Sequence, residues 1–231
     1  MDIVDTGGGT PVVFLHAATG HSAMWEQQFP AFTAAGYRCI AFDRSAEGFA
    51  SDQVEEVAAR LKLERFHLVG TAAGAIIAID YALSHATRLR GLVAANTIVG
   101  AQDADYLELS QRLRPSPQFE KMPADFRELG PAYRAANAEG TRRWNELARA
   151  KPRVSYTVRN RITYAALETI KLPTLLLTGD GDVYMPPPVL RLFAKRFPRC
   201  ESVVLAECGH SGYWEQPEAF NRAVLDFLRK N

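Results

Sequence analysis

Residues 65–78 constrain the fold of this chain more than any other stretch. A short apolar run, residues 66–69, leads into a turn of small residues and then, without a spacer, into an alanine and isoleucine run typical of a buried helix. Glycines four positions apart, Gly70 and Gly74, allow the strand and the helix to approach closely around a strained residue. The sequence therefore predicts a strand, a sharp turn and a buried helix, with Ala72 at the centre of the turn.

Apolar runs alternate with helical patterns over most of the remaining chain. Further strands are expected at residues 3–4, 12–15, 38–42, 89–95, 172–178 and 202–206, and further helices at residues 23–34, 53–61, 187–196 and 217–230. Strands that alternate with helices predict a mostly parallel sheet with helices on both faces, an α/β fold. In such a sheet the functional residues gather at the carboxyl ends of the strands.

Residues 100–164 depart from this alternation. Strand signals almost disappear there, and short helical pieces are interrupted by prolines, namely Pro115, Pro117, Pro123, Pro131 and Pro152. We therefore expect one α/β core, formed by residues 1–99 and 165–231, with a small helical cap inserted at residues 100–164.

The balanced composition argues against several classes of partner. The formal net charge is +1 and charged residues make up 23% of the chain, so no long-range field attracts nucleic acid or an anionic membrane. No apolar run approaches the roughly 20 residues of a membrane span, and the first residues lack a signal-peptide pattern. Cys39, Cys200 and Cys208 have no metal-ligand spacing and are expected to be inert thiols. We expect a cytoplasmic monomer or homodimer that binds a small molecule and uses no metal and no cofactor.

Three loops at strand ends carry residues suited to acid–base chemistry. The turn around Ala72 is the first, the loop at residues 178–186 with Asp180 and Asp182 is the second, and the loop at residues 207–214 with His210 is the third. A glycine-flanked turn, then an acid, then a histidine is the chain order of an α/β-hydrolase catalytic triad. In that triad the histidine is the general base and the carboxylate fixes its tautomer.

The chain resembles the α/β-hydrolase superfamily, in particular its compact bacterial members with a helical cap. The resemblance extends from about Val12 to Phe227 and rests on ordered motifs, which are residues 14–20, residues 42–44 followed by Gly48, residues 70–74, residues 179–182 and residues 209–210. It covers nearly the whole chain. One departure is that residues 51–53 lead directly into a helix, where many members have a longer connection.

The resemblance implies a role for each matching residue. His210 stands at the position of the base and Asp182 at that of the acid, with Asp180 as the alternative acid. The backbone N–H groups of Ala17 and Ala73 stand where the family forms its oxyanion hole. Ala72 stands where the family has its nucleophilic serine, and natural loss and deliberate Ser→Ala replacement both explain it.

Residues that could bind substrate are less well defined by the sequence. Trp25, Tyr106 and Trp144 are candidates for the pocket wall, with a place in the core as the alternative. Further aromatic residues suggest an apolar pocket under the cap, and these are Phe119, Phe126, Tyr133, Tyr156 and, in the histidine loop, Trp214. Cap arginines could receive a substrate carboxylate or pair with neighbouring glutamates, and these include Arg112, Arg114, Arg142 and Arg143.

Other polar residues near the expected site have weaker claims. His16 is expected to form structural hydrogen bonds rather than to transfer protons. Cys208 and Thr71 are unfavoured substitutes for the missing nucleophile. Cys208 would face the same way as His210, two residues later, only if the strand stayed regular there. The Thr71 side chain is expected to point away from the site.

These implications predict a hydrolase of the ester, lactone or C–C bond type that acts on a small, largely apolar substrate able to carry a carboxylate. Removal of a triad nucleophile typically costs about 10⁶ in turnover, so a chain with Ala72 is expected to be nearly silent on ordinary esters. Two alternatives stay open: a silent homologue that only binds its ligand, and a cofactor-free lyase or isomerase in which His210 moves protons.

Overall fold

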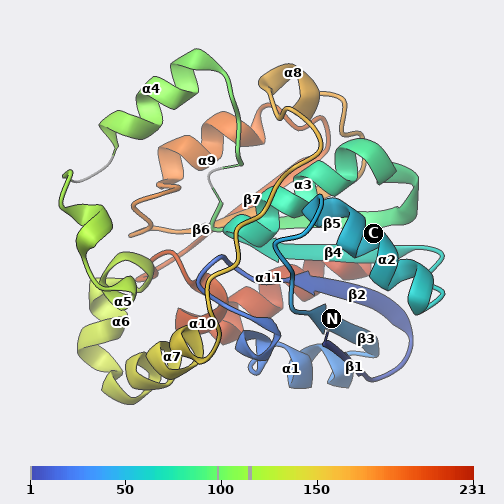
Figure 1. Cartoon of the computed structure of the whole chain (residues 1–231), viewed down its shortest axis with the longest axis horizontal. Helices are drawn as coiled ribbons and strands as arrows, with labels where there is room; N and C mark the ends of the chain where they lie inside the picture. Colours follow the sequence, from blue (N-terminus) through green and yellow to red (C-terminus); the bar gives the residue numbers. More distant parts are fainter. Residues whose placement is uncertain (1, 98, 114–115) are drawn as a thin grey trace.

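The computed structural model describes residues 2–97, 99–113 and 116–231. A seven-stranded sheet lies at its centre, in the order β1-β3-β2-β4-β5-β6-β7 (Figure 1). The strands are β1 (Ile3–Thr6), β2 (Thr10–Leu15), β3 (Tyr37–Phe42), β4 (Phe66–Thr71), β5 (Leu89–Ala95), β6 (Thr174–Gly179) and β7 (Cys200–Leu205). The pair β1 and β3 is antiparallel and every other pair is parallel, which confirms the predicted α/β fold.

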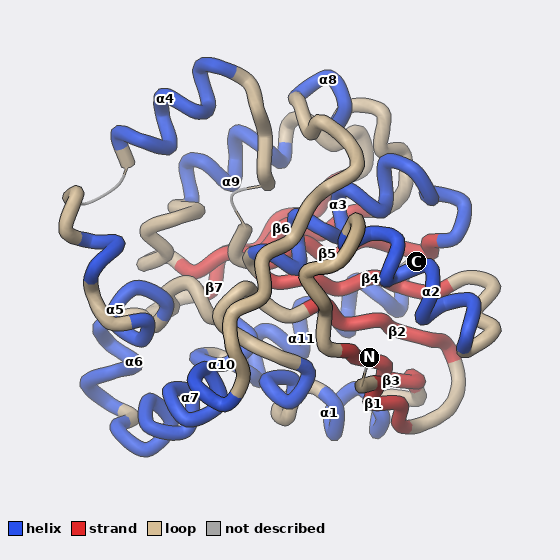
Figure 2. Tube along the Cα trace, viewed as in Figure 1, coloured by secondary structure: helices blue, strands red, loops and turns tan. Residues whose placement is uncertain are grey.

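Helices cover both faces of the sheet (Figure 2). One face packs against α2 (Ala50–Arg60), α3 (Ala73–His85) and α9 (Pro187–Ala194), and the opposite face against α1 (Phe29–Ala34) and α11 (Pro217–Lys230). The strand β2 shows why: Val13 and Leu15 belong to the first core, whereas Val12 and Phe14 belong to the second. Successive side chains of a strand point to opposite faces, so an apolar run such as residues 12–15 is buried on both sides.

Element boundaries differ from the prediction where proline intervenes. The expected helix at residues 23–34 is divided into a short 3₁₀ helix, η1 (Ser22–Trp25), and α1, which has Pro30 in its first turn. Proline lacks an N–H, so it is tolerated at the start of a helix but not in its interior. For the same reason β6 begins at Thr174, directly after Pro173, and not at Leu172.

The described residues between 100 and 164 form helices and loops without a strand. The helices are α4 (Ala104–Arg112), η3 (Phe119–Lys121), α5 (Ala124–Glu128), α6 (Pro131–Ala136) and α7 (Ala138–Ala150). Residues 151–163, which we call the crossing segment, then run across the front of the molecule to α8 (Tyr164–Leu167) (Figure 1). The Asp80 carboxylate of α3 holds this segment, because it accepts hydrogen bonds from the backbone N–H groups of Arg159 (3.0 Å) and Asn160 (2.7 Å). Arg114 and Pro115 lie outside the described residues.

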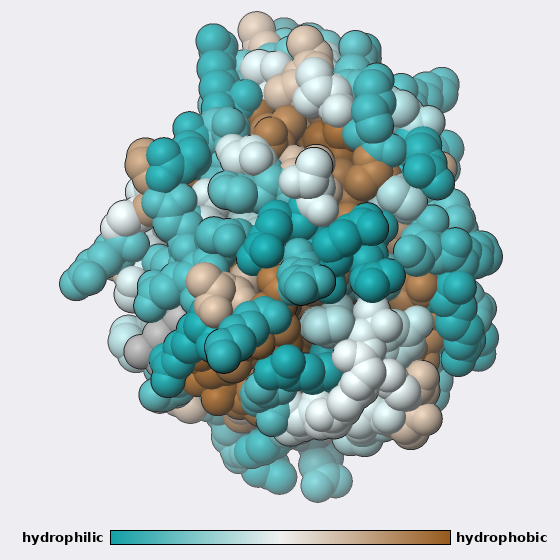
Figure 3. Space-filling model, turned by 90° about the vertical axis from the view of Figure 1, so that its right-hand side faces the viewer, coloured by the Kyte–Doolittle hydropathy of each residue, from teal (hydrophilic) through white to brown (hydrophobic). Residues whose placement is uncertain are grey.

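The surface is mixed in character. On the face drawn in Figure 3, hydrophilic residues predominate and apolar residues show in separate areas. Of the helices that the structure describes, none combines the length and the hydropathy needed to cross a membrane.

Candidate active site

The turn between β4 and α3 has the close, strained geometry that its glycines predict. A Cβ atom on Gly70 would lie 2.4 Å from the Gly74 carbonyl oxygen, and one on Gly74 would lie 2.1 Å from the Leu15 carbonyl oxygen, so neither position has room for a side chain. Between them Ala72 has φ 49° and ψ −116°. A non-glycine residue in such a conformation costs about 1–3 kcal/mol and persists only where the surrounding packing enforces it.

His210 and Asp182 form a buried pair. The Nδ1 atom of His210 lies 2.9 Å from both carboxylate oxygens of Asp182. That carboxylate also accepts hydrogen bonds from Asn96 Nδ2 (3.1 Å), Thr178 Oγ1 (3.0 Å) and the backbone N–H groups of Tyr184 (2.9 Å) and Met185 (3.1 Å). Burial raises the pKa of Asp182, but His210 and the hydrogen bonds from Met185 and Asn96 outweigh it, and the pKa is lower than usual. The carboxylate is therefore ionised and fixed in direction.

The neighbouring aspartate, Asp180, has a different task. Its carboxylate accepts hydrogen bonds from the backbone N–H groups of Glu207 and Cys208, both at 3.0 Å. These bonds tie the loop after β6 to the loop after β7. The structure thus brings Asp182, and not Asp180, together with His210.

A second carboxylate lies on the other side of the imidazole. Glu128, the last residue of α5, places Oε2 4.0 Å from His210 Nε2, and its carbonyl oxygen accepts the His210 backbone N–H at 3.0 Å. Burial lowers the pKa of His210, but Asp182 and Glu128 raise it more, to about 9. Burial likewise raises the pKa of the Glu128 carboxyl. No sequence pattern indicated Glu128, which looks like one polar residue of a short amphipathic helix.

Glu215, in α10 (Gly212–Glu215), fastens the Glu128 segment to the histidine loop. Its carboxylate accepts three backbone N–H groups, those of Gly130 (2.8 Å), Gly209 (2.9 Å) and Ser211 (3.0 Å). The two backbones are so close that a Cβ atom on Gly209 would lie 2.4 Å from the Gly130 nitrogen. Glu128 is consequently held beside His210 through the backbone of its own segment, which the Glu215 carboxylate fastens to the histidine loop.

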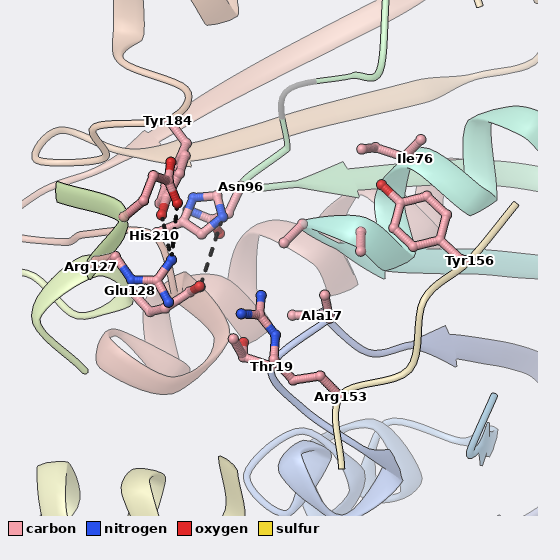
Figure 4. Close-up of a pocket in the computed structure, with 14 residues that line it drawn as sticks. Ala17, Thr19, Ile76, Asn96, Arg127, Glu128, Arg153, Tyr156, Tyr184 and His210 are labelled. Carbon is pink, nitrogen blue, oxygen red and sulfur yellow. Dashed lines mark hydrogen bonds and ion pairs between the residues drawn. The ribbon is translucent and has the colours of Figure 1, made fainter. Parts of the chain in front are cut away.

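A cavity of about 210 Å³ joins the turn to the histidine. His210, Glu128, Arg127 and Tyr184 lie at one end of it and Ile76 and Tyr156 at the other, while Arg153 points into it from the crossing segment (Figure 4). Ala17, Ala72 and Ala73 line its floor. The first N–H groups of a helix have no intrahelical acceptor, so the Ala73 N–H at the start of α3 can serve a ligand in this cavity.

The predicted pocket aromatics lie elsewhere, which corrects that part of the sequence interpretation. Trp25 packs in the core that α1 and α11 cover, with its ring centroid 5.1 Å from that of Phe14. Trp144 is fully buried in the same core. Tyr106 packs edge-on against Phe193 in the core on the opposite face of the sheet. Large aromatic rings gain most by full burial, and here the core provides it. Trp214 is also buried in the core, where its Nε1 donates to a backbone carbonyl in α7.

The other aromatic candidates are divided between sites. Tyr156 lines the cavity, as expected. Phe119 and Phe126 line a neighbouring cavity of about 420 Å³ that also reaches Arg127 and His210. Tyr133 instead receives a hydrogen bond from Asn137 Nδ2 at 3.2 Å.

The arginines at the cavity are not those that the sequence singled out. Arg112, Arg142 and Arg143 form exposed ion pairs with glutamates and do not line it. Arg127 and Arg153 do line it. Only tertiary structure distinguishes these two from the other arginines of the same segment.

The remaining polar candidates are structural. His16 Nδ1 lies 2.7 Å from the Ala17 carbonyl oxygen, and burial together with Arg44 lowers the His16 pKa to about 3, so the ring stays neutral. Cys208 is buried and burial raises its thiol pKa, so it is a poor nucleophile. Thr71 is buried in β4 and does not line the cavity. Among the described residues, no group of three or more His, Cys, Asp or Glu side chains could hold a metal ion.

Comparison with known proteins agrees with the fold. Residues 12–223 match the Alpha/beta hydrolase family, and the chain belongs to that family. A Mycobacterium tuberculosis protein that carries the name non-heme bromoperoxidase BpoC is 29% identical over 261 aligned positions, covering 97% of this chain and 95% of that protein. The alignment is longer than the chain of 231 residues, so this chain lacks segments that its relative has.

Other relatives are hydrolases by name or by structure. A 2-hydroxy-6-oxononadienedioate/2-hydroxy-6-oxononatrienedioate hydrolase from Burkholderia vietnamiensis is 28% identical, covering 98% of this chain and 90% of that protein. An esterase from Thermogutta terrifontis superposes with a TM-score of 0.84 at 24% identity, covering 99% of this chain and 93% of the other. The identity to that solved structure is low, so it supports the shared fold alone.

Proposed function

We propose that this chain is a hydrolase in which His210, held by Asp182, removes a proton from water as the water attacks a substrate carbonyl. One observation carries the proposal: His210 keeps its Nδ1 atom 2.9 Å from Asp182 and lines the same cavity as Ala17 and Ala73. The N–H groups of these two residues would stabilise the oxyanion that forms on the carbonyl oxygen. Ala72 has no hydroxyl, so the route avoids an acyl-enzyme and water is the nucleophile.

The cavity favours a small substrate with a carboxylate. Its volume of about 210 Å³ is below the usual range of ligand pockets, roughly 300–1,000 Å³. Arg127 and Arg153 line it, and a guanidinium binds a carboxylate with two parallel hydrogen bonds. The name of the Burkholderia vietnamiensis relative specifies a dicarboxylate, which supports the same substrate class. Esters, lactones and ketones with a cleavable C–C bond all present the required carbonyl.

The helical segment contributes to this function as a cap. We assign residues 100–164 to the cap and residues 1–99 and 165–231 to the core, because α5 and the crossing segment supply Glu128, Arg127 and Arg153 to the cavity wall. Substrate recognition would then lie in the cap and bond cleavage in the core.

Hydrolysis of a matched ester pair tests both parts of the proposal. Monoethyl succinate carries a carboxylate where ethyl 4-methylpentanoate carries an isopropyl group of similar shape. We expect His210→Ala to lower kcat/KM on both esters by about 10²–10⁴, the usual contribution of a general base. Arg153→Ala should lower it roughly tenfold on the carboxylated ester alone, whereas the exposed Arg112→Ala serves as the control. Unchanged hydrolysis by His210→Ala would refute the proposal.

The Ala72→Ser variant tests whether a serine at the centre of the turn can act as a nucleophile. The introduced serine should react with a fluorophosphonate probe and raise turnover of 4-nitrophenyl acetate, since the proposed acid, base and oxyanion donors would then act on its hydroxyl. If instead succinate raises the Tm while no variant hydrolyses any ester, the chain only binds its ligand.

A further inference from the structure

Glu128 is a buried acid that the hydrolytic route described so far leaves unused. Its side chain is 9% exposed, lines the cavity, and lies 4.0 Å from His210 Nε2, on the side of the ring opposite Asp182. Within the described part of the chain, His210 is the residue whose side chain lies within ion-pair distance of the Glu128 carboxylate. Figure 4 shows the carboxylate and the imidazole facing each other at one end of the cavity.

The charges around the pair favour a shared proton. His210 faces three carboxylates, those of Asp182, Glu128 and Glu215. The charged groups that face Glu128 are His210, Asp182 and the guanidinium groups of Arg127 and Arg153. The hydroxyl groups of Tyr184 and Tyr213 are also near its carboxylate. Burial raises the pKa of Glu128 while His210 and the arginines lower it. Two groups coupled in this way titrate as a pair.

We propose that Glu128 is a catalytic residue, the general acid that protonates the leaving group while His210 acts as the base. The inference rests on the proposed hydrolysis. It differs from the serine-hydrolase route, in which the histidine alone takes and returns the proton. Two separate groups for acid and base are the arrangement by which other hydrolases activate water directly.

The proton balance closes over one turnover. As the water oxygen bonds to the carbonyl carbon, one water proton passes to His210 Nε2. When the tetrahedral intermediate collapses, the bond to the leaving group breaks, and the leaving oxygen takes its electron pair and the proton of the Glu128 carboxyl. The products are a carboxylic acid and an alcohol. The imidazolium then returns its proton to the Glu128 carboxylate, 4.0 Å away, and both groups regain their starting state.

This cycle has a distinctive dependence on pH. Below pH 9 the pair shares one proton, which lies mainly on His210, and the productive form is the minor one in which Glu128 carries that proton and His210 is neutral. Loss of that proton, at a pH near the His210 pKa of about 9, removes the acid. Hydrolysis of an alkyl ester should therefore fall above pH 9. A nitrophenyl ester needs no acid, because nitrophenolate leaves unprotonated. Its hydrolysis should instead rise through the same pH, as His210 loses its proton and becomes available as the base.

Glu128→Gln, which keeps the shape of the side chain, tests the assignment on ethyl butyrate and 4-nitrophenyl butyrate. We expect kcat/KM to fall by about 10²–10⁴ on the ethyl ester and not to fall on the nitrophenyl ester. The decline above pH 9 should disappear. Asp125→Asn, which makes the same change of charge on the same helix away from the cavity, should leave both rates unchanged. Equal losses on both esters, or no loss on either, would overturn the role of Glu128.

Two further results separate this inference from the proposed function. If His210→Ala hydrolyses both esters at the wild-type rate, the hydrolytic function itself fails. NMR titration of the imidazole needs no turnover: Glu128→Gln should lower the His210 pKa below about 9, and an unchanged pKa would overturn the proton exchange between the two groups.

Discussion

The turn around Ala72 and the loop around His210 meet at one cavity but are held by different means. The turn depends on backbone packing, with Gly70 and Gly74 pressed against neighbouring carbonyl groups. The histidine loop depends on side chains, above all the carboxylates of Asp182 and Glu215, each of which accepts several hydrogen bonds. A turn held by its backbone keeps its geometry whichever small residue stands at its centre. The acid–base pair has no such tolerance.

The largest effect should come from Asp182→Asn. The amide keeps the shape of the carboxylate but loses the charge that stabilises the protonated imidazole and selects its tautomer, so we expect kcat/KM on monoethyl succinate to fall by about 10²–10⁴. Asp180→Asn is the matched control, because the Asp180 carboxylate accepts hydrogen bonds from backbone N–H groups of the next loop. Similar losses in both variants would mean that the loop, and not the pair, supports turnover.

The pair should also give the histidine loop a pH-dependent stability. The folded state raises the His210 pKa from 6.5 to about 9, so the stabilisation is complete below pH 6.5 and is lost as the pH rises to about 9. The shift corresponds to about 3 kcal/mol. Asp182 has a lowered pKa, so its contribution is present above its ordinary value of 3.8 and is lost in acid. Urea unfolding from pH 4 to 10 should show the loss of stability between pH 6.5 and 9 in the wild type and not in His210→Ala. Parallel curves of unfolding free energy against pH for the two proteins would contradict the prediction.

A methyl group at Gly130 should disrupt the contact between α5 and the histidine loop. The new Cβ atom would lie 2.8 Å from Glu215 Oε2 and 2.9 Å from the Gly209 nitrogen. Forced overpacking of this kind costs about 1–3 kcal/mol in the free energy of unfolding. Gly8→Ala, with nothing within 4 Å of its Cβ atom, is the control and should cost nothing. If both variants unfold at the same urea concentration, the contact is looser than the structure indicates.

The smallest effect, with the opposite sign, is expected at the turn. Ala72→Gly relieves the strain of φ 49° but makes the unfolded chain more flexible, so we expect a net stabilisation of about 1 kcal/mol. The same exchange at Ala78, inside α3, should destabilise by about 1 kcal/mol. A loss of stability at both positions would show that the turn is unstrained.

The sequence predicts these two regions better than it predicts the rest of the site. Glycine spacing indicated the turn because close backbone approach requires that residue type. Chain order indicated an acid followed by a histidine, and the family resemblance favoured Asp182 with Asp180 as the alternative. The cavity wall was not predictable in this way. Glu128 and Arg153 are ordinary polar residues until Glu215 and Asp80 fix their segments against the core. The prediction that Trp25 and Trp144 line the pocket was wrong, because a large aromatic ring suits a core as well as a pocket and both residues lie in the core.

The hydrogen bonds of Glu215 bear on how such proteins can diverge. An inserted helical segment is commonly regarded as a module that one protein can exchange for another. Here the buried carboxylate of Glu215, in the core, accepts one of its hydrogen bonds from the Gly130 N–H, in the helical segment. A transplanted segment without that N–H group would leave the carboxylate without this donor. The loss would cost about 1–3 kcal/mol in the free energy of unfolding. Positions 130, 209 and 215 should therefore change together among homologues, and exchange of the helical segment should succeed only where all three are carried along.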